Sequence, residues 1–360
     1  MTSMDRTGVV DDLNPFGRQV RRLAALLAAA LVAVILFAAW AFLVPHALPT
    51  LKSNMPLVTR IVCTGSDKCL AVDDLGGLTR FAFGGKSVRI QWDDTQTGIN
   101  AISCASHRFC VAGDLKGRIA EVIDGRLGAF YSVDPKADKT RFGDRQSGIS
   151  AIKCLSDRFC LAGDVEGRIY QFDGRRWVLS YRHAAKKKFR NQFGAVVSIG
   201  CSSSTQCLAG NRGGSLELFN GHNWAQVGST GSLNSDVSCP ASSHCLIATS
   251  DGRITTWYGG WTLSYSRLKG STPGLEGFGG VTGIACEANT SCVATDWEGQ
   301  VFWYSSGRWS APHKVDPYLP FEGVTCSNYH RCVAWDFENR VYWLRPDGTV
   351  HMTHLFGIRD

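Results

Sequence analysis

Short apolar segments alternate with tight-turn signals along most of the chain, and the same arrangement returns seven times. A strand-like run leads into a cysteine, as at Ile102–Cys104, and a second run opens with another cysteine, as at Cys160–Gly163. A third run has apolar or aromatic residues at consecutive positions, as in Val301–Tyr304. Short runs rich in Val, Ile, Tyr and Trp between turn residues predict β-strands. The pattern therefore predicts an all-β chain built from repeated units.

The turns recur with the strands. Four residues after the second cysteine each unit has a short polar side chain, at Asp73, Asp114, Asp164, Asn211, Thr249, Asp296 and Asp336. Three residues later stands a residue that tolerates positive φ, at Gly76, Gly117, Gly167, Gly214, Gly252, Gly299 and Asn339. Such pairs indicate a hairpin turn. A later turn carries dipeptides such as Asp124-Gly125, which two-residue hairpins prefer, and a fourth run follows, often with Trp at its start, as at Trp177. Each unit is thus predicted to hold four strands.

The cysteines set the number of units. All fourteen fall into pairs with the spacing C-x5-C, and the first members are 38 to 50 residues apart. The seven pairs are Cys63/Cys69, Cys104/Cys110, Cys154/Cys160, Cys201/Cys207, Cys239/Cys245, Cys286/Cys292 and Cys326/Cys332. A four-stranded unit with a period of about 40–50 residues is typical of a propeller blade. We therefore expect a closed seven-bladed β-propeller.

The spacing also bears on what the cysteines do. A zinc site needs shorter hooks that bring four ligands to one metal, and the C-x-x-C redox motif is absent. A catalytic thiol does not explain why the position is filled in the same way in every unit. Disulfides fit, one in the first hairpin of each blade, at about 2 kcal/mol for so short a loop. An even count with no leftover thiol indicates an oxidising compartment.

Three units place an arginine four residues after the turn aspartate, at Asp114/Arg118, Asp164/Arg168 and Asp336/Arg340. A repeated ring of ion-binding residues is one interpretation. An ion pair across each hairpin is the interpretation that we favour, because the aspartate position also carries Asn211 and Thr249. An exposed pair of this kind contributes at most about 1 kcal/mol.

An uncharged apolar segment precedes the repeats. Leu23–Val44 holds 22 residues without a charge, which is long enough to cross a bilayer as a helix. Arg18, Arg21 and Arg22 flank its N-terminal side, so the positive-inside rule places the N-terminus in the cytoplasm. We expect a cytoplasmic tail (1–22), a transmembrane signal-anchor (23–44), a tether (45–57) and the propeller (58–360).

This expectation predicts where the protein is located in the cell. It is a single-pass protein of the cytoplasmic membrane, with its propeller in the periplasm or the extracellular space. The alternative is a long secretory signal cleaved at Ala41, since Ala39–Ala41 resembles an A-x-A site. The retained anchor is favoured because the apolar run exceeds the usual core of a signal peptide. Nucleic acid is not an expected partner at this address.

Basic residues gather in two long connections between blades. Connections between successive blades lie on one face of a propeller, so neighbouring connections form one sector of its rim. The cations are Lys136, Lys139, Arg141, Arg145, Arg182, Lys186, Lys187, Lys188 and Arg190. Such a sector attracts anionic partners, either lipid headgroups, acidic glycans or an acidic protein surface. A solvated basic loop without a ligand is the alternative.

Aromatic residues offer a weaker signal for binding. Trp297 and Trp335 lie within or beside the turn after the second strand of their units. Exposed tryptophans stack on sugars or contact proteins, but packing within the hairpin is the favoured role here. The nine histidines are scattered, and no HExxH or GxSxG motif is present. We therefore expect no cofactor, no metal and no catalysis, with a glycan-active hydrolase or lyase as the alternative.

The repeated pattern I-x-C-x5-C-[LV]-A-x-D-x-x-G-x-[IV] resembles the cysteine-paired propeller repeats of bacterial secreted and membrane-anchored proteins. These repeats are WD40-like in shape, although the Gly-His and Trp-Asp signatures of WD40 units are missing here. The resemblance covers residues 58–357. It implies a rigid interaction platform outside the cytoplasmic membrane, which binds envelope or membrane proteins, with an anionic glycan or lipid as the alternative ligand.

Overall fold

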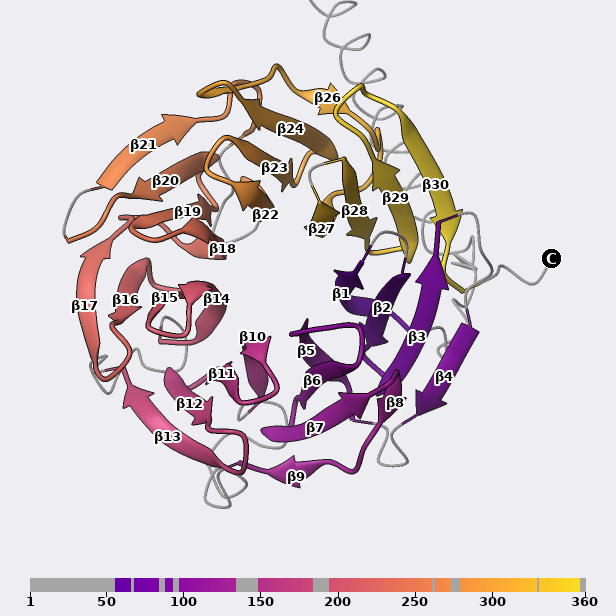
Figure 1. Cartoon of the computed structure of the whole chain (residues 1–360). Helices are drawn as coiled ribbons and strands as arrows, with labels where there is room; N and C mark the ends of the chain where they lie inside the picture. The colour runs from indigo at the N-terminus through magenta and orange to yellow at the C-terminus, as the bar shows by residue number, and fades with distance from the viewer. Residues whose placement is uncertain are drawn as a thin grey trace, which may run out of the picture. The chain divides into compact units, whose positions relative to one another are not determined.

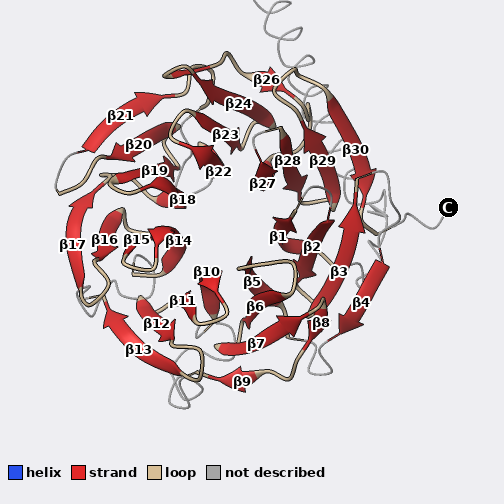
Figure 2. Ribbon diagram, in the orientation of Figure 1, coloured by secondary structure: helices blue, strands red, loops and turns tan. Residues whose placement is uncertain are grey.

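The protein is described by a computed structural model over residues 56–65, 68–83, 88–92, 97–133, 148–183, 194–260, 263–272, 279–328 and 330–356. These residues belong to the unit Pro56–Asp360 and form a ring of seven antiparallel sheets around a central channel (Figure 1). Figure 2 shows that strands and turns make up the described part. No helix among those residues is long and apolar enough to cross a membrane. The predicted anchor and the alternative cleavage site at Ala41 lie outside the described ranges, as does the predicted tether except for its last two residues, 56 and 57.

Five blades are sheets of four consecutive strands. Blade 1 consists of β1 (Val58–Thr64), β2 (Lys68–Asp73), β3 (Gly77–Ala82) and β4 (Val88–Trp92), and blade 3 of β10 (Ile149–Ser156), β11 (Phe159–Asp164), β12 (Arg168–Phe172) and β13 (Trp177–Arg182). Blade 4 consists of β14 (Val196–Ser203), β15 (Gln206–Asn211), β16 (Ser215–Phe219) and β17 (Trp224–Ser229). Blade 5 consists of β18 (Asn234–Ala241), β19 (His244–Thr249), β20 (Arg253–Trp257) and β21 (Leu263–Arg267), and blade 7 of β27 (Phe321–Asn328), β28 (Arg331–Asp336), β29 (Arg340–Leu344) and β30 (Val350–His354).

The outer strand is divided in the other two blades. Blade 2 consists of β5 (Ile99–Cys104), β6 (Phe109–Asp114), β7 (Arg118–Ile123) and the short β8 (Arg126–Leu127) and β9 (Tyr131–Ser132), which both pair with β7. Blade 6 consists of β22 (Val281–Ala288), β23 (Ser291–Asp296), β24 (Gln300–Ser305) and the short β25 (Arg308–Trp309) and β26 (His313–Lys314), which both pair with β24. The predicted seven blades are confirmed, with this interruption of two outer strands.

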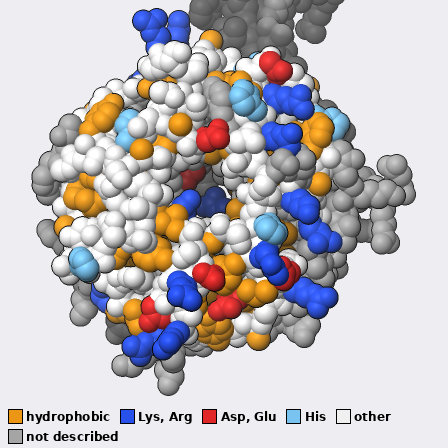
Figure 3. All heavy atoms as spheres, viewed as in Figure 1, with side chains coloured by type: hydrophobic (Ala, Val, Ile, Leu, Met, Phe, Trp, Pro, Cys, Tyr) orange, Lys and Arg blue, Asp and Glu red, His pale blue; other side chains and the backbone are white. Residues whose placement is uncertain are grey.

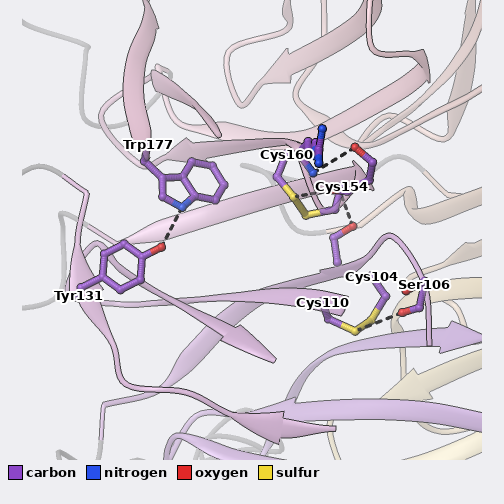
Figure 4. Close-up of a disulfide and its surroundings, with 10 residues drawn as sticks. Cys104, Ser106, Cys110, Tyr131, Cys154, Cys160 and Trp177 are labelled. Carbon is purple, nitrogen blue, oxygen red and sulfur yellow. Dashed lines mark hydrogen bonds between the residues drawn. A yellow bond between two sulfur atoms is a disulfide. The ribbon is translucent and has the colours of Figure 1, made fainter. Parts of the chain in front are cut away.

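One disulfide closes the first hairpin of every blade. In six blades the paired cysteines are direct partners in the sheet, the exception being blade 5. The Cα atoms of all seven pairs are 3.9–4.1 Å apart, and no free cysteine remains among the residues described. Figure 4 shows two of them, Cys104–Cys110 and Cys154–Cys160, in neighbouring blades. The same view shows the Trp177 indole N–H donating to the Tyr131 hydroxyl at 3.2 Å, a link between those blades. The predicted intrablade disulfides are confirmed.

The apolar core is divided among the seven interfaces between blades. Each core cluster combines buried side chains from two neighbouring sheets. Between blades 1 and 2, for example, Leu78 of β3 and Ile99 of β5 are both fully buried in one cluster. The two faces of each sheet therefore pack against different neighbours, which explains why the third strand of each blade is apolar on both faces.

The disulfides close their own hairpins as predicted, and they also belong to the core between blades. The second cysteine of every pair is at most 2% exposed, and each of the seven core clusters contains one of them, namely Cys69, Cys110, Cys160, Cys207, Cys245, Cys292 and Cys332. The reason is their place on the second strand, which has a strand on either side in its own sheet and a neighbouring blade against its face. These cysteines are therefore part of the apolar core between blades.

The turn aspartates form the predicted ion pairs across their hairpins, and their side chains are buried. Asp114 accepts the backbone N–H groups of Lys116 and Arg118 at 2.9 and 2.8 Å, and its other oxygen lies 2.6 Å from the Arg118 guanidinium. The side chain of Asp114 is 0% exposed. The pairs at Asp164/Arg168 and Asp336/Arg340 are built in the same way. Because the carboxylate satisfies the turn's own amides, each pair belongs to the hairpin rather than to a ring of ligands.

The blades without a turn aspartate replace it from nearby positions. In blade 5 the Thr249 hydroxyl lies 2.6 Å from the Asp251 carboxylate, which also binds Arg253 at 2.5 Å. In blade 4 the Asn211 amide donates to Glu217 at 3.2 Å. A carboxylate therefore lies beside the side chain that replaces the aspartate in both blades, from the turn in blade 5 and from β16 in blade 4.

The ring closes without strand exchange between its ends. Blade 7 has its own outer strand β30, as expected, and no described strand precedes β1 in blade 1. The Asn339 side chain joins the two blades: its Oδ1 accepts the N–H of Val58 and its Nδ2 donates to the carbonyl of Pro56, both at 2.8 Å. Asn339 is buried and has a φ of 63°. Asn339 stands where the other blades have glycine, and its side chain provides hydrogen bonds between blade 7 and blade 1.

Candidate functional site: the mouth of the central channel

A bulge recurs at the start of the innermost strand in every blade. The register shifts after the first residue of that strand, so the second residue is skipped in the pairing. Bulges change the direction of a side chain, and here the skipped residues surround one end of the channel. They are Thr59, Asn100, Ser150, Val197, Ser235, Thr282 and Glu322, and all seven line the same pocket. We call this the mouth pocket.

Most of the polar members of this ring connect one blade to the next. Thr59, Ser150 and Ser235 donate their hydroxyl groups to the carbonyls of Ile99, Val196 and Val281, the first residues of inner strands in the neighbouring blades, at 2.5–2.6 Å. The Asn100 amide makes the equivalent bond to Ile149 at 3.4 Å. These side chains therefore hold the blades in place around the opening. Glu322, in the position between blades 7 and 1, is the ionisable member.

The mouth pocket has a volume of about 400 Å³ and opens on the face that carries the connections between blades. Its charged lining consists of Arg60 from β1, Arg212 from the β15–β16 turn and Glu322 from β27. Among the described residues, neither guanidinium has an ion pair or a side-chain hydrogen bond. The pocket therefore presents two guanidinium groups outside any close ion pair, together with one carboxyl group.

An aromatic wall borders the pocket on blades 6 and 7. Trp297 and Phe337 occupy equivalent turn positions in these blades, directly after the buried aspartates Asp296 and Asp336. Their rings meet edge to face with centroids 5.8 Å apart, and Phe337 is 40% exposed. Trp335, in contrast, is 2% exposed and packs in the core between blades 7 and 1, so its packing extends beyond the hairpin to which the prediction assigned it.

A second cavity continues into the channel. It has a volume of about 180 Å³, and Lys153 and Asp236 line it together with Arg60, which also lines the mouth pocket. Figure 3 shows the opening at the centre of the ring, with charged side chains visible inside it. The Asp236 carboxylate accepts hydrogen bonds from the Ser198 hydroxyl (2.7 Å) and the Ile284 backbone N–H (3.0 Å). It therefore links blade 5 to both of its neighbours.

The surroundings of these groups shift their acidity. Burial raises the pKa of Glu322 to about 7, although the charge of Arg60 opposes the increase. Burial also raises the pKa of Asp236, against the hydrogen bond from Ile284 and the charge of Arg60. The same effect lowers the pKa of Lys153, and the charge of Asp236 partly offsets it. Loss of hydration thus disfavours the charged form of all three groups.

The predicted basic sector is largely outside the described residues. Eight of its nine cations fall in 134–147 and 184–193, and the described member, Arg182, is exposed at the end of β13. The two connections lead into β10 and β14, the inner strands of adjacent blades. The sector as a docking surface remains a prediction, and the structure does not bring Arg182 into the mouth pocket.

All fourteen cysteines lie within the described residues, and none of them lines the mouth pocket or the inner cavity. Each pair is joined within its own blade, and the second members are buried between blades: Cys69, Cys110, Cys160, Cys207, Cys245, Cys292 and Cys332. The cysteines therefore form the disulfides that the sequence predicts.

The channel also bears on the alternative of a glycan-active enzyme, which requires carboxyl groups that converge on a substrate. Glu322 lines the mouth pocket, whereas Asp236 lines the inner cavity and is held by hydrogen bonds from three groups. The two carboxyl groups thus do not face one common pocket. Among the described residues there is also no cluster of histidine, cysteine and acidic side chains suited to a metal ion.

Sequence reasoning missed Arg60, Lys153, Asp236 and Glu322. The sequence does distinguish these four residues, because each is charged at a repeat position where the other blades have small, neutral or apolar residues. At the position of Glu322 the others have Thr, Asn, Ser or Val, and at that of Arg60 and Asp236 they have Ala, Ser or Gly. Alignment of the inner strands by their cysteines marks these four charged residues as departures from the repeat, and the structure places them along the channel.

Comparison with known proteins supports the fold. No protein-family model and no curated protein sequence matches the chain. Among solved structures, it is similar to the WD40 propeller domain of Doa1, with a TM-score of 0.59, 14% identity and coverage of 82% of this chain and 92% of that one. It is also similar to U3-55K (TM-score 0.61, 12% identity, 85% and 91% covered) and to the RRP9 WD40 repeats (0.59, 13%, 79% and 88%). The chain is thus a seven-bladed propeller of WD40-like shape with a disulfide in every blade.

Proposed function

We propose that the protein is a membrane-anchored, extracytoplasmic and non-catalytic propeller that binds other proteins as a subunit or accessory factor of a membrane or envelope complex. One observation carries the proposal: all fourteen cysteines are paired within blades and none is free. Such pairing is typical of proteins that fold in an oxidising compartment. The apolar segment Leu23–Val44 supplies the means of export and anchoring.

The binding role is supported by the rigidity of the ring and by the character of its mouth. Inter-blade hydrogen bonds fix the ring of bulge residues, and the two guanidinium groups and the exposed aromatic ring lie beside it. Arginine and aromatic side chains dominate the binding energy of many protein interfaces. WD40-like folds in general act as platforms for protein interaction, which is consistent with this role.

Two experiments test the proposal on the full-length protein. Crosslinking of a tagged chain in native membranes, followed by purification and mass spectrometry, is expected to recover defined membrane or envelope proteins. An empty recovery would contradict the binding role. In unbroken cells with a permeable outer layer, a membrane-impermeant protease is expected to cleave the propeller, and complete protection would contradict the extracytoplasmic address.

Binding of an anionic envelope polymer is the second candidate, and the basic sector favours it. Its test is the replacement of Lys186, Lys187 and Lys188 by glutamate. If this sector provides the docking surface, the reversal of charge abolishes recovery of the ligand, because like charges then face each other. Unchanged recovery removes the basic sector from the interaction.

A further inference from the structure

The mouth pocket is built to receive a charged group. Its lining places two guanidinium groups, Arg60 and Arg212, against one carboxyl group, Glu322. Even with Glu322 ionised the pocket carries a net positive charge, and its arginines are free of ion pairs among the described residues. A cationic side chain entering here would meet two like charges, whereas an anionic one would meet unpaired donors.

The position of Arg60 makes it the central contact. It lines both the mouth pocket and the inner cavity, so it lies between the two. The nearest acidic group on the inner side, Asp236, is already bonded to Ser198, Val237 and Ile284. Donors of Arg60 therefore remain for a carboxylate that enters from the mouth, and an arginine can bind a carboxylate through two hydrogen bonds.

The aromatic wall adds an apolar requirement. Trp297 and Phe337 stand on blades 6 and 7, while Arg212 comes from blade 4 on another part of the rim. A ligand that fills the pocket thus contacts charge in the centre and an aromatic surface at the edge. The volume of about 400 Å³ suits one or two side chains that project from a longer segment.

We infer that the mouth pocket binds an acidic segment of a partner protein, with one carboxylate side chain on Arg60 and a neighbouring apolar side chain on Trp297 and Phe337. This inference rests on the proposed protein-binding function and specifies the chemistry of its partner.

Glu322 gives the site a pH signature. The charged groups that face it are Arg60 on β1, Asp336 on β28 and Asp74 in the β2–β3 turn. With a pKa of about 7, Glu322 is half ionised at neutral pH, and its negative charge opposes an incoming carboxylate. Affinity is therefore expected to increase as the pH falls through 7, because protonation removes this repulsion.

The test is a selection from a phage-displayed library of random short peptides on the full-length protein in nanodiscs. The expected result is enrichment of peptides that pair Asp or Glu with an aromatic or large aliphatic residue. Enrichment of basic peptides, or no enrichment on the native protein beyond that on the Arg60→Gln variant, would overturn the inference. If a complex is still recovered from membranes in either case, the inference fails while the proposed function stands.

Variants assign the selected peptides to the pocket. Arg60→Gln is expected to weaken binding by about 10-fold or more, since it removes a charge-assisted contact. Phe337→Ala, at an exposed turn, tests the aromatic wall independently of the channel, and Arg126→Gln, an exposed arginine on β8, is the matched control. Glu322→Gln is expected to remove the pH dependence around 7. Unchanged affinity in folded Arg60→Gln and Phe337→Ala variants would exclude this pocket.

Discussion

The Asn339 side chain holds the backbone of Val58 across the junction between the last and the first blade. Its carbonyl oxygen lies 2.8 Å from the Val58 nitrogen, and its amide nitrogen lies 2.8 Å from the Pro56 oxygen. The turn position that it occupies is a glycine in the other six blades. Asn339, which differs from the glycine of the other units, thus connects the last blade to a residue of the first blade that is 281 positions away in the sequence.

Replacement of Asn339 by glycine is predicted to destabilise the ring. Glycine accommodates the positive φ, so the change removes the two hydrogen bonds and leaves a buried N–H and carbonyl without partners. We expect a loss of about 1–3 kcal/mol in the free energy of unfolding, measured by urea denaturation. The control is Asn220→Gly, in an exposed turn within blade 4, which should cost less. Equal losses in the two variants would show that Asn339 has no closing role.

Asp296 is predicted to make the protein less stable as the pH rises. It is buried, and glutamine at position 300 replaces the arginine that pairs with the equivalent aspartate in three other blades. Burial raises its pKa from 3.8 to about 6. Because the folded state binds the proton more tightly, the contribution of Asp296 is most favourable below about pH 4 and declines between about pH 4 and 6.

Asp296→Asn is the variant that checks this pH dependence. Asn211 occupies the same position in blade 4, so the amide is compatible with the turn. The variant is expected to flatten the decline in the free energy of unfolding over that pH range, with a gain on the order of 1–3 kcal/mol at pH 7. Asp336→Asn is the contrasting change, since it removes the buried turn carboxylate that binds the Arg340 guanidinium at 2.6 Å, and it should destabilise the fold. An unaltered pH profile in Asp296→Asn would refute the assignment.

Asp236 is predicted to support the ring rather than to bind ligand. Asp236→Asn keeps the shape of the side chain but places an N–H₂ group where one carboxylate oxygen accepts hydrogen bonds. A loss of about 1–3 kcal/mol is expected, because a buried donor of a neighbouring blade loses its acceptor. Ser235→Ala, which removes one inter-blade hydroxyl bond, is expected to cost about 1 kcal/mol. Full stability of Asp236→Asn, with altered peptide binding, would instead place Asp236 in the binding site.

Removal of single disulfides is predicted to have a similar effect in every blade. The double substitutions Cys104→Ala/Cys110→Ala and Cys286→Ala/Cys292→Ala each open one pair with a sequence separation of 6. Alanine is chosen because the second cysteine of each pair is buried, where a serine hydroxyl would need a partner. Each change should cost about 2–4 kcal/mol, measured by the denaturation midpoint under non-reducing conditions. A large loss from one pair and none from the other would contradict the equivalence of the disulfides.

The blades could be predicted from the sequence because their determinants are local. The two cysteines of a pair, the turn aspartate with its arginine, and the Asp-Gly or Asn-Gly turns all act within a few residues. The strand order of each unit can therefore be predicted from that unit alone. The mouth could not be predicted in this way. Whether Glu322 and Arg60 point into the channel depends on the bulge at the start of the inner strand, and their proximity depends on closure of the ring.

The substitutions in the turn between the second and third strands also could not be interpreted from local sequence alone. Thr249 and Asn211 read as losses of the repeated aspartate, yet Asp251 and Glu217 bring a carboxylate back from other positions. A single repeat aligned with its neighbours cannot reveal this exchange, because the compensating residue occupies a different position in the pattern. The compensation becomes visible when the side chains are placed in space.

The arrangement of disulfides and core clusters has a consequence for where along the ring the polypeptide can begin and end. Each disulfide bond is closed within a blade and each apolar cluster lies between two blades, so no covalent crosslink joins one described blade to another. The seam between blades 7 and 1 is chemically comparable to the other six, apart from the Asn339 clamp. A circularly permuted chain, opened at another inter-blade connection and joined across the present seam, should therefore form the same ring with all seven disulfides.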